Sequence, residues 1–175
     1  MMKWTLIILG VVASLIVLCL IVGALLPRDH VASSAATIPA TPDTVWRTIT
    51  DVAAAPTWRD VKTVEILPPT NGKLRWREVS GFGPITFEQD EAVAPRRFVA
   101  RIADTDQGFG GTWTFEIEPA QQASRVTITE RGFVSNPLFR FMSRFVFGYH
   151  GTQEAYLRAL GRKFGQHEVT VERRQ

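Results

Sequence analysis

The chain has 175 residues, of which 45% are hydrophobic and 21% charged, and its formal net charge is +3. This length suits one domain of ordinary size with a short additional segment, and the composition is typical of a folded protein. The lysines and arginines are scattered rather than clustered, which argues against a nucleic-acid-binding surface, so we expect no nucleic-acid partner.

An uncharged apolar segment, WTLIILGVVASLIVLCLIVGALL, runs from Trp4 to Leu26 near the amino terminus. As a helix rising about 1.5 Å per residue it is roughly 35 Å long, enough to cross a hydrocarbon core of about 30 Å. A cleaved signal peptide is the alternative, but its apolar part usually has only about 7–15 residues. We predict a transmembrane helix, an uncleaved single-pass anchor over residues 1–26.

The orientation of this anchor depends on few charges. Lys3 and the amino terminus favour the amino end inside, and Arg28 on the far side argues against it. We place the domain on the outer or periplasmic face. Residues 27–34 are then expected to be a linker, which at about 3.3 Å per residue keeps the domain close to the bilayer.

A short amphipathic helix is predicted after the linker. Thr41 is a suitable N-cap, and Pro42 suits the first helical turn. Asp51 is expected to end this helix, and Pro56 to break a second short one. Trp58 follows the break.

Apolar residues then alternate with polar ones, which predicts six short strands. Turn residues separate the strands, for example in the stretch from Pro68 to Gly72, so neighbouring strands should pair antiparallel. Each strand can direct one apolar face inward. The expected strands cover residues 61–67, 73–79, 85–93, 96–103, 112–118 and 125–133.

A helical period replaces the alternation from Pro137 to Gly165. Asn136 is a suitable N-cap, and Gly165 is a suitable C-terminal stop. One long helix is therefore predicted, and its apolar side should pack on the apolar face of the sheet. That side contains Leu138, Phe141, Met142, Phe145, Tyr149, Tyr156 and Leu160.

Several stretches resemble the START-like or SRPBCC superfamily: TPDTVWRTITDVAAAPTW, GTWTFEIEP, SRVTITERG and the long final helix. The stretch ITERGFVSNPLFRFMSRFVFGY is similar to a membrane-anchored bacterial subgroup of the polyketide cyclase/dehydrase kind. The resemblance covers residues 35–165 and leaves 166–175 as a tail. It implies an α+β helix-grip fold, in which a curved antiparallel β-sheet wraps a long C-terminal α-helix and encloses a cavity.

The resemblance implies that a hydrophobic small molecule or lipid binds in this cavity. Two other functions remain open: a polyketide cyclase/dehydratase-like enzyme, and a protein-interaction module of the chaperone-ATPase-activator kind. Trp58 is expected near the mouth of the cavity, or as a plug of the core. The expected ligand-binding residues are Trp58, Trp76, Phe87, Phe98, Trp113, Phe115, Phe141, Phe145, Tyr149 and Tyr156.

No catalytic constellation is visible in the sequence, so the catalytic residues stay unknown and the chain is not expected to be an enzyme. Glu130, which continues the inward face of its strand, and His150 are the candidates for moving a proton. The histidines are not spaced as metal ligands and the glycine-rich stretches lack the lysine of a phosphate loop, so no metal or cofactor is expected.

One aromatic residue of the predicted long helix falls on its polar side. Phe147 lies there by helical phase, among arginines that include Arg140 and Arg144. Beside a membrane anchor, an aromatic residue flanked by arginines can enter the headgroup region of a bilayer. We therefore predict that Arg140, Arg144 and Phe147 contact the membrane.

Overall fold

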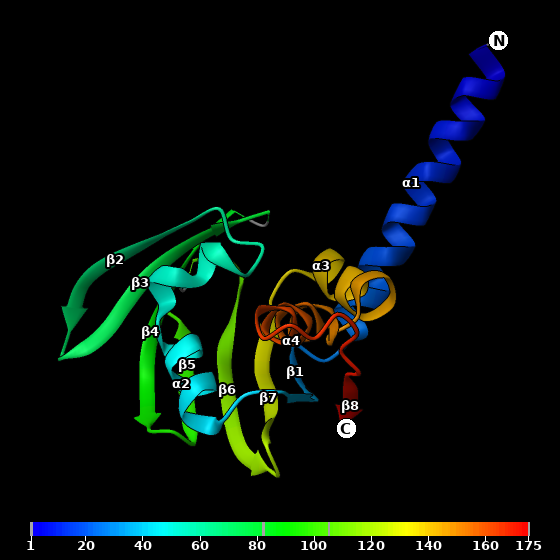
Figure 1. Cartoon of the computed structure of the whole chain (residues 1–175). Coiled ribbons are helices and arrows are strands. Elements are labelled where there is room, and N and C mark those ends of the chain that lie inside the picture. Colours follow the sequence, from blue (N-terminus) through cyan, green and yellow to red (C-terminus); the bar gives the residue numbers. More distant parts are fainter. Residues whose placement is uncertain (1, 82, 105, 175) are drawn as a thin grey trace.

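The computed structural model describes residues 2–81, 83–104 and 106–174 and contains one antiparallel sheet, packed helices and a protruding amino-terminal helix (Figure 1). Helix α1 (Met2–Leu25) extends away from the rest of the chain. Within the described residues, one helix, Lys3–Leu25, is long and apolar enough to cross a membrane. Only 6% of its most apolar window is buried inside the protein.

The sheet has eight strands in the order β2-β3-β4-β5-β6-β7-β1-β8. Every neighbouring pair is antiparallel, as the alternating pattern and short turns predict. The strands are β1 (Asp29–Ile38), β2 (Thr63–Thr70), β3 (Lys73–Ser80), β4 (Gly83–Val93), β5 (Arg97–Ile102), β6 (Phe109–Ala120), β7 (Ala123–Val134) and β8 (Glu172–Arg174).

The β2–β3 connection is tighter than the run of turn residues predicts. Strand β2 continues through Pro68 and Pro69, and the turn itself is made by Asn71 and Gly72, which have φ of 52° and 75°. Two residues with positive φ match the twist of a hairpin. The prolines are tolerated because β2 is an edge strand and an edge strand need not donate every N–H.

Helices cover one face of the sheet (Figure 1). Helix α2 (Pro42–Thr50) is followed by the 3₁₀ helix η1 (Val52–Thr57), with Asp51 between them as predicted. Helix α4 (Gly151–Lys163) crosses the same face. The core contains Ile38, Val45, Ile117, Leu157 and Leu160, all almost fully buried. The α+β helix-grip architecture is thus confirmed.

The prediction of a single helix from Pro137 to Gly165 is wrong. Helix α3 (Pro137–Met142) passes into a π-helical turn η2 (Ser143–Phe147), and Gly148, with φ of 72°, then ends it. Helix α4 starts afresh at Gly151. The cause is local, since glycine populates positive φ readily and two glycines lie close together here. The predicted ends are confirmed: Asn136 accepts hydrogen bonds from two N–H groups of α3, and Gly165 has φ of 80°.

The prediction of a linker over residues 27–34 is wrong for most of its length. Residues 29–34 form the first part of β1. They pair with β7 continuously, from Asp29 opposite Phe133 to Ser34 opposite Ile128. Ser34 is completely buried. The sheet therefore begins only a few residues after α1.

The end of the chain also joins the sheet. Strand β8 pairs with β1, and Arg173 of β8 donates a hydrogen bond to Glu154 of α4 at 2.6 Å. Burial would raise the pKa of Glu154, but hydrogen bonds from Arg173 and Arg158 lower it below its ordinary value. The carboxylate thus stays charged and connects β8 to α4. From the sequence, residues 166–175 are expected to be a tail. In the structure, Glu172–Arg174 of this segment form β8 and belong to the sheet.

Candidate functional site: an aromatic interior with a polar mouth

The strand register brings aromatic residues together on the face of the sheet that α4 covers. Trp76 lies opposite Phe87, and Phe98 lies opposite Phe115. Trp113 is on the same strand as Phe115, two residues away, and therefore points to the same side. The period-two pattern in the sequence predicted this common face.

Tyr156 of α4 is at the centre of these rings. Its ring centroid lies 5.1 Å from that of Phe115, 6.1 Å from Trp113 and 5.2 Å from Trp58. We call the resulting group the aromatic cluster. Its members are Trp58, Trp76, Phe87, Phe98, Trp113, Phe115 and Tyr156, each joined to another by a ring contact.

The resemblance to START-like proteins implies a cavity between the sheet and the C-terminal helix, and the ring contacts lie in that region. The spacings and tilted or edge-on geometries are those of packed aromatic pairs. Trp58 meets Tyr156 edge-on at an interplanar angle of 88°. Its indole therefore covers one end of the cluster.

A largely buried ion pair borders the cluster. Arg59 donates a hydrogen bond from Nη2 to Oε1 of Glu78 at 2.5 Å, and the indole Nε1 of Trp76 donates to the same oxygen at 3.0 Å. The guanidinium carbon of Arg59 lies 4.9 Å from the ring centroid of Tyr156, within cation–π range. A charged pair thus closes an otherwise apolar interior.

Burial raises the pKa of the Tyr156 phenol well above its ordinary value; the Arg59 guanidinium opposes this, and Glu78 adds to it. Because ionisation is disfavoured, the phenol remains protonated at neutral pH. Tyr156 can therefore donate a hydrogen bond, and it is not poised as a general base.

Two buried N–H groups beside the cluster have no hydrogen-bond partner: Nε1 of Trp58 and Nε of Arg59. A buried donor without an acceptor costs roughly 1–3 kcal/mol. Such groups are uncommon in folded proteins, and an acceptor supplied from outside would satisfy them.

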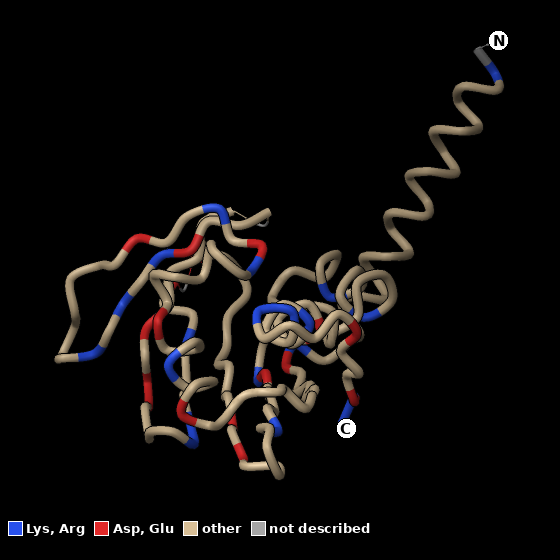
Figure 2. The backbone as a smooth tube through the Cα atoms, viewed as in Figure 1, with Lys and Arg blue, Asp and Glu red and all other residues tan. Residues whose placement is uncertain are grey.

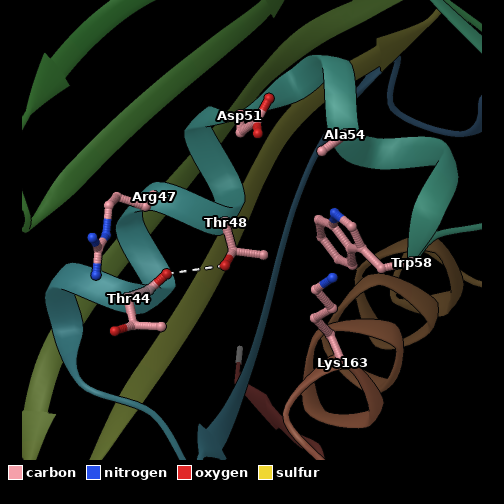
Figure 3. Close-up of a pocket in the computed structure, with 7 residues that line it drawn as sticks. All are labelled: Thr44, Arg47, Thr48, Asp51, Ala54, Trp58 and Lys163. Carbon is pink, nitrogen blue, oxygen red and sulfur yellow. Dashed lines mark hydrogen bonds between the residues drawn. The ribbon is translucent and has the colours of Figure 1, made fainter.

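A pocket of about 300 Å³ opens beside Trp58, between α2, η1 and the end of α4 (Figure 3). Figure 3 shows the Trp58 indole and the Lys163 side chain next to each other on one side of it. Thr44, Arg47, Thr48, Asp51 and Ala54 line the rest. The pocket thus combines an aromatic wall with charged and hydroxyl groups. A second pocket, of about 430 Å³, is lined by residues outside the cluster: Arg77, Pro84, Thr86, Asp104, Asp106 and Gln107.

Three of the predicted ligand-binding residues lie away from the cluster. Phe141 and Phe145 contact each other at 5.0 Å, and Phe145 is exposed. Tyr149 stacks on His30 at 4.3 Å. The reason is the break at Gly148, which removes the helical phase that would have aligned these residues with Tyr156.

Glu130 points to the face of the sheet that carries Trp113, its direct cross-strand partner. Its Oε1 lies 3.5 Å from Nε2 of His30, a residue that the sequence placed in a linker. His150 contacts the hydroxyl of Ser34 through Nδ1 at 3.2 Å. The two catalytic candidates therefore have different partners, and both partners come from β1.

The expected membrane-contact residues are in two different environments. Arg140 is buried, and it donates hydrogen bonds to the main-chain oxygens of Leu26 and Ser135, so the prediction that it contacts lipid is wrong. Helical phase alone could not show that the end of α1 lies against this residue. Arg144 and Phe147 are exposed.

Sequence reasoning missed His30, Arg59 and Glu78. Arg59 follows η1, whereas Glu78 lies in β3, 19 residues later, so the pairing depends on the tertiary fold and neither residue stands out alone. A signal for Glu78 existed, because it follows Trp76 by two positions and shares its inward face.

A family model described as "Polyketide cyclase / dehydrase and lipid transport" matches residues 29–165. The chain belongs to this family. It has the START-like fold of the SRPBCC superfamily, as its motifs suggested. The family match begins at Asp29, the first residue of β1. This agrees with a domain that includes residues 29–34, which the sequence alone assigns to a linker.

Solved structures with the same fold include the ZhuI aromatase/cyclase from Streptomyces sp. R1128, with 18% identity and a TM-score of 0.66 over 79% of this chain and 94% of that one. A protein from Thermus thermophilus, TTHA0849, has 20% identity and a TM-score of 0.62 over 77% and 97% of the two chains. A START superfamily protein from Mycobacterium smegmatis has 18% identity and a TM-score of 0.61 over 79% and 99%. A comparison with curated proteins gave no match. These likenesses establish the fold.

Proposed function

We propose that the chain is a membrane-tethered START-like domain that binds a hydrophobic small molecule or lipid between its sheet and α4. The observation that carries this proposal is the aromatic cluster, which a pocket approaches at Trp58. Apolar pockets with a few placed polar groups are the usual form of small-molecule sites. The family, whose description includes lipid transport, supports the same class of ligand.

The ligand enters, in this proposal, by displacing Trp58. The indole covers the cluster through a single edge-on contact with Tyr156, and it is only partly buried. Rotation of this side chain joins the pocket to the interior. The unpaired Nε1 of Trp58 and Nε of Arg59 then meet an acceptor oxygen on the ligand, so an amphiphile with an apolar body and an oxygen-bearing end fits best.

A photoactivatable diazirine fatty acid tests this binding in the full chain held in detergent micelles. We expect crosslinked peptides to include those with Trp113 or Tyr156, and excess unlabelled oleic acid to suppress them. Trp58→Ala should alter the yield at these peptides severalfold, whereas Val93→Ala, a change at an exposed apolar side chain of β4, should not. Labelling confined to α1 and insensitive to competition would refute the binding site.

The tether is tested separately. A chain anchored by α1 should stay with membranes after extraction at alkaline pH, because the apolar segment exceeds the length needed to span. Release of the intact chain, or recovery of a chain cleaved near Ala35, would contradict an uncleaved anchor.

A cyclase/dehydratase activity is the second candidate, and the position of Glu130 favours it. Its carboxylate lies on the inward face beside Trp113 and within 3.5 Å of His30, so an acid–base pair borders the apolar interior. A poly-β-ketone thioester analogue would be the probe. Turnover that Glu130→Gln abolishes while fatty-acid crosslinking persists would support the enzyme, and absence of turnover in the parent chain would argue against it.

A further inference from the structure

Helix α3 and the π-helical turn display a group of large apolar side chains to solvent. Phe139 is 62% exposed and Phe147 is 64% exposed. We call this surface the α3 patch. Its members are Leu138, Phe139, Phe145, Val146 and Phe147. Single exposed apolar residues are common in soluble proteins, but a contiguous group marks a surface that contacts something apolar.

Helix α3, which carries part of the patch, lies at the end of α1 (Figure 1). A Cβ at Gly23 would come within 1.9 Å of the main-chain oxygen of Pro137, so the start of α3 packs directly on the backbone of α1. Arg140 strengthens this contact by donating a hydrogen bond at 2.8 Å to the oxygen of Leu26.

This contact sets the depth of the patch relative to α1. Gly23 lies inside the apolar segment, three residues before its end at Leu26, which is about 4.5 Å along a helix. When α1 spans a bilayer, Gly23 is near the boundary between acyl chains and headgroups. Helix α3 must then begin at that level too, because it touches Gly23.

The change of helical geometry explains why these side chains face outward. A regular α-helix through residues 137–165 would align Phe145 with Tyr156 and the sheet. The π-helical turn and the break at Gly148 change this phase, so that Phe145 is exposed together with Phe147, which a regular helix would also direct outward. Asn136 caps α3 and fixes where the segment starts.

The charges around the patch suit a lipid surface. The stretch from Ser135 to Gly148 contains no acidic residue, and of its two arginines Arg140 is buried against α1 and only Arg144 faces outward. Arg144 is exposed, and Arg28 at the end of α1 donates a hydrogen bond to the hydroxyl of Ser135. Figure 2 shows α1 uncharged along its length except near its amino end. Basic groups next to an apolar surface favour anionic headgroups.

We propose that the α3 patch inserts into the headgroup–acyl boundary of the leaflet from which α1 emerges. The domain is then held at two points, by a spanning helix and by an interfacial segment, and its orientation on the bilayer is fixed. This inference rests on the proposed membrane tether. It goes beyond the tether because it assigns lipid contact to α3 and the π-helical turn as well as to α1.

Spin labels placed in the full chain test the insertion in nanodiscs that contain phosphatidylcholine and phosphatidylglycerol. Cys19 is the only cysteine and lies in α1, so a label on the unaltered chain reports whether α1 is in the bilayer. The patch is labelled in Cys19→Ala/Phe147→Cys. The matched control is Cys19→Ala/Ile66→Cys, because Ile66 is also an exposed apolar residue but lies on edge strand β2.

Collisions with oxygen, which concentrates in lipid, and with a water-soluble nickel chelate report the depth of each label. We expect the oxygen-to-nickel collision ratio of the Phe147→Cys label to be severalfold higher than that of the Ile66→Cys label. Equal ratios, with the Cys19 label buried in lipid, would overturn the patch proposal and leave the tether intact. A Phe147→Cys label shielded from both reagents would also overturn it, since that pattern indicates a protein partner or a second copy.

Discussion

At the scale of single residues, Arg59 and Glu78 form an ion pair beside the aromatic cluster. The strand register places the aromatic side chains Trp76, Phe87 and Phe115 on the same inward face. Arg59 follows a 3₁₀ helix whose position depends on tertiary packing, so its approach to Glu78 is a property of the fold. This pair closes the interior at the end that Trp58 covers.

The ion pair should matter more than a surface pair of the same kind. In Glu78→Leu, Arg59 and the indole of Trp76 lose their acceptor while they stay largely buried. We expect a loss of about 2 kcal/mol in the free energy of unfolding, less than for a fully buried pair because both side chains retain some exposure. Denaturant titration of the full chain in detergent, followed by near-UV circular dichroism, measures this.

The matched control is Glu65→Leu, which removes an exposed partner of Arg77 on the same sheet and should cost less than about 0.5 kcal/mol. Arg59→Met/Glu78→Leu should regain more than half of the stability lost, because no unpaired charge remains. Equal losses in the two glutamate variants, or additive losses in the double variant, would contradict a coupled pair.

At the scale of secondary-structure elements, the sequence predicts most strands and helix ends well, because turn residues and caps act locally. Asn136 and Gly165 are examples. The interior of the last helix is the exception. Its apolar residues fit a helical period, but Gly148 adopts a positive φ that interrupts the phase. Glycine permits this break without requiring it, and the break allows α3 to pack on α1 while α4 packs on the sheet.

The packing of α3 on α1 predicts a role for Arg140. In Arg140→Met, α3 loses the hydrogen bonds to the main-chain oxygens of Leu26 and Ser135 and can detach from α1. Hydrogen bonds from charged groups contribute about 1.5–3 kcal/mol, so amide exchange over residues 137–147 should become roughly tenfold faster. Hydrogen-exchange mass spectrometry of the full chain in nanodiscs measures this.

Arg144→Met provides the control for that exchange experiment. It removes the same charge from the same segment, but Arg144 is exposed, so exchange over residues 137–147 should change little. If both variants exchange equally fast, the general loss of positive charge explains the result, and Arg140 does not connect α3 to α1.

At the scale of the whole molecule, the sequence predicts an anchor that is separate from the domain, whereas in the structure α1 packs on α3 and leads within a few residues into β1. Ser33, Ser34 and the alanines around them suggest a flexible linker by composition. They form a strand inside the sheet, next to its edge, because β7 and β8 supply hydrogen-bond partners on both sides and α4 covers one face. Small residues suit this strand, since α4 lies against it: Gln153 donates to the oxygen of Ala32 at 3.0 Å. The linker prediction failed because its partners are about 100 residues away in the chain.

The position of β1 predicts where the chain can be shortened. A chain that starts at Arg28 keeps all of β1, including the hydrogen bond from Val134 N–H to the oxygen of Arg28. A chain that starts at Ala35 loses β1 from Asp29 to Ser34, exposes the matching part of β7 and removes the acceptor of Gln153. We expect the first chain to unfold cooperatively. The second should melt at least about 10 °C lower or aggregate, because several kcal/mol of burial and pairing are lost. Size-exclusion chromatography and thermal circular dichroism in mild detergent compare the two chains, both of which lack α1. Equal melting temperatures would mean that the first half of β1 is dispensable and that residues 27–34 act as a linker after all.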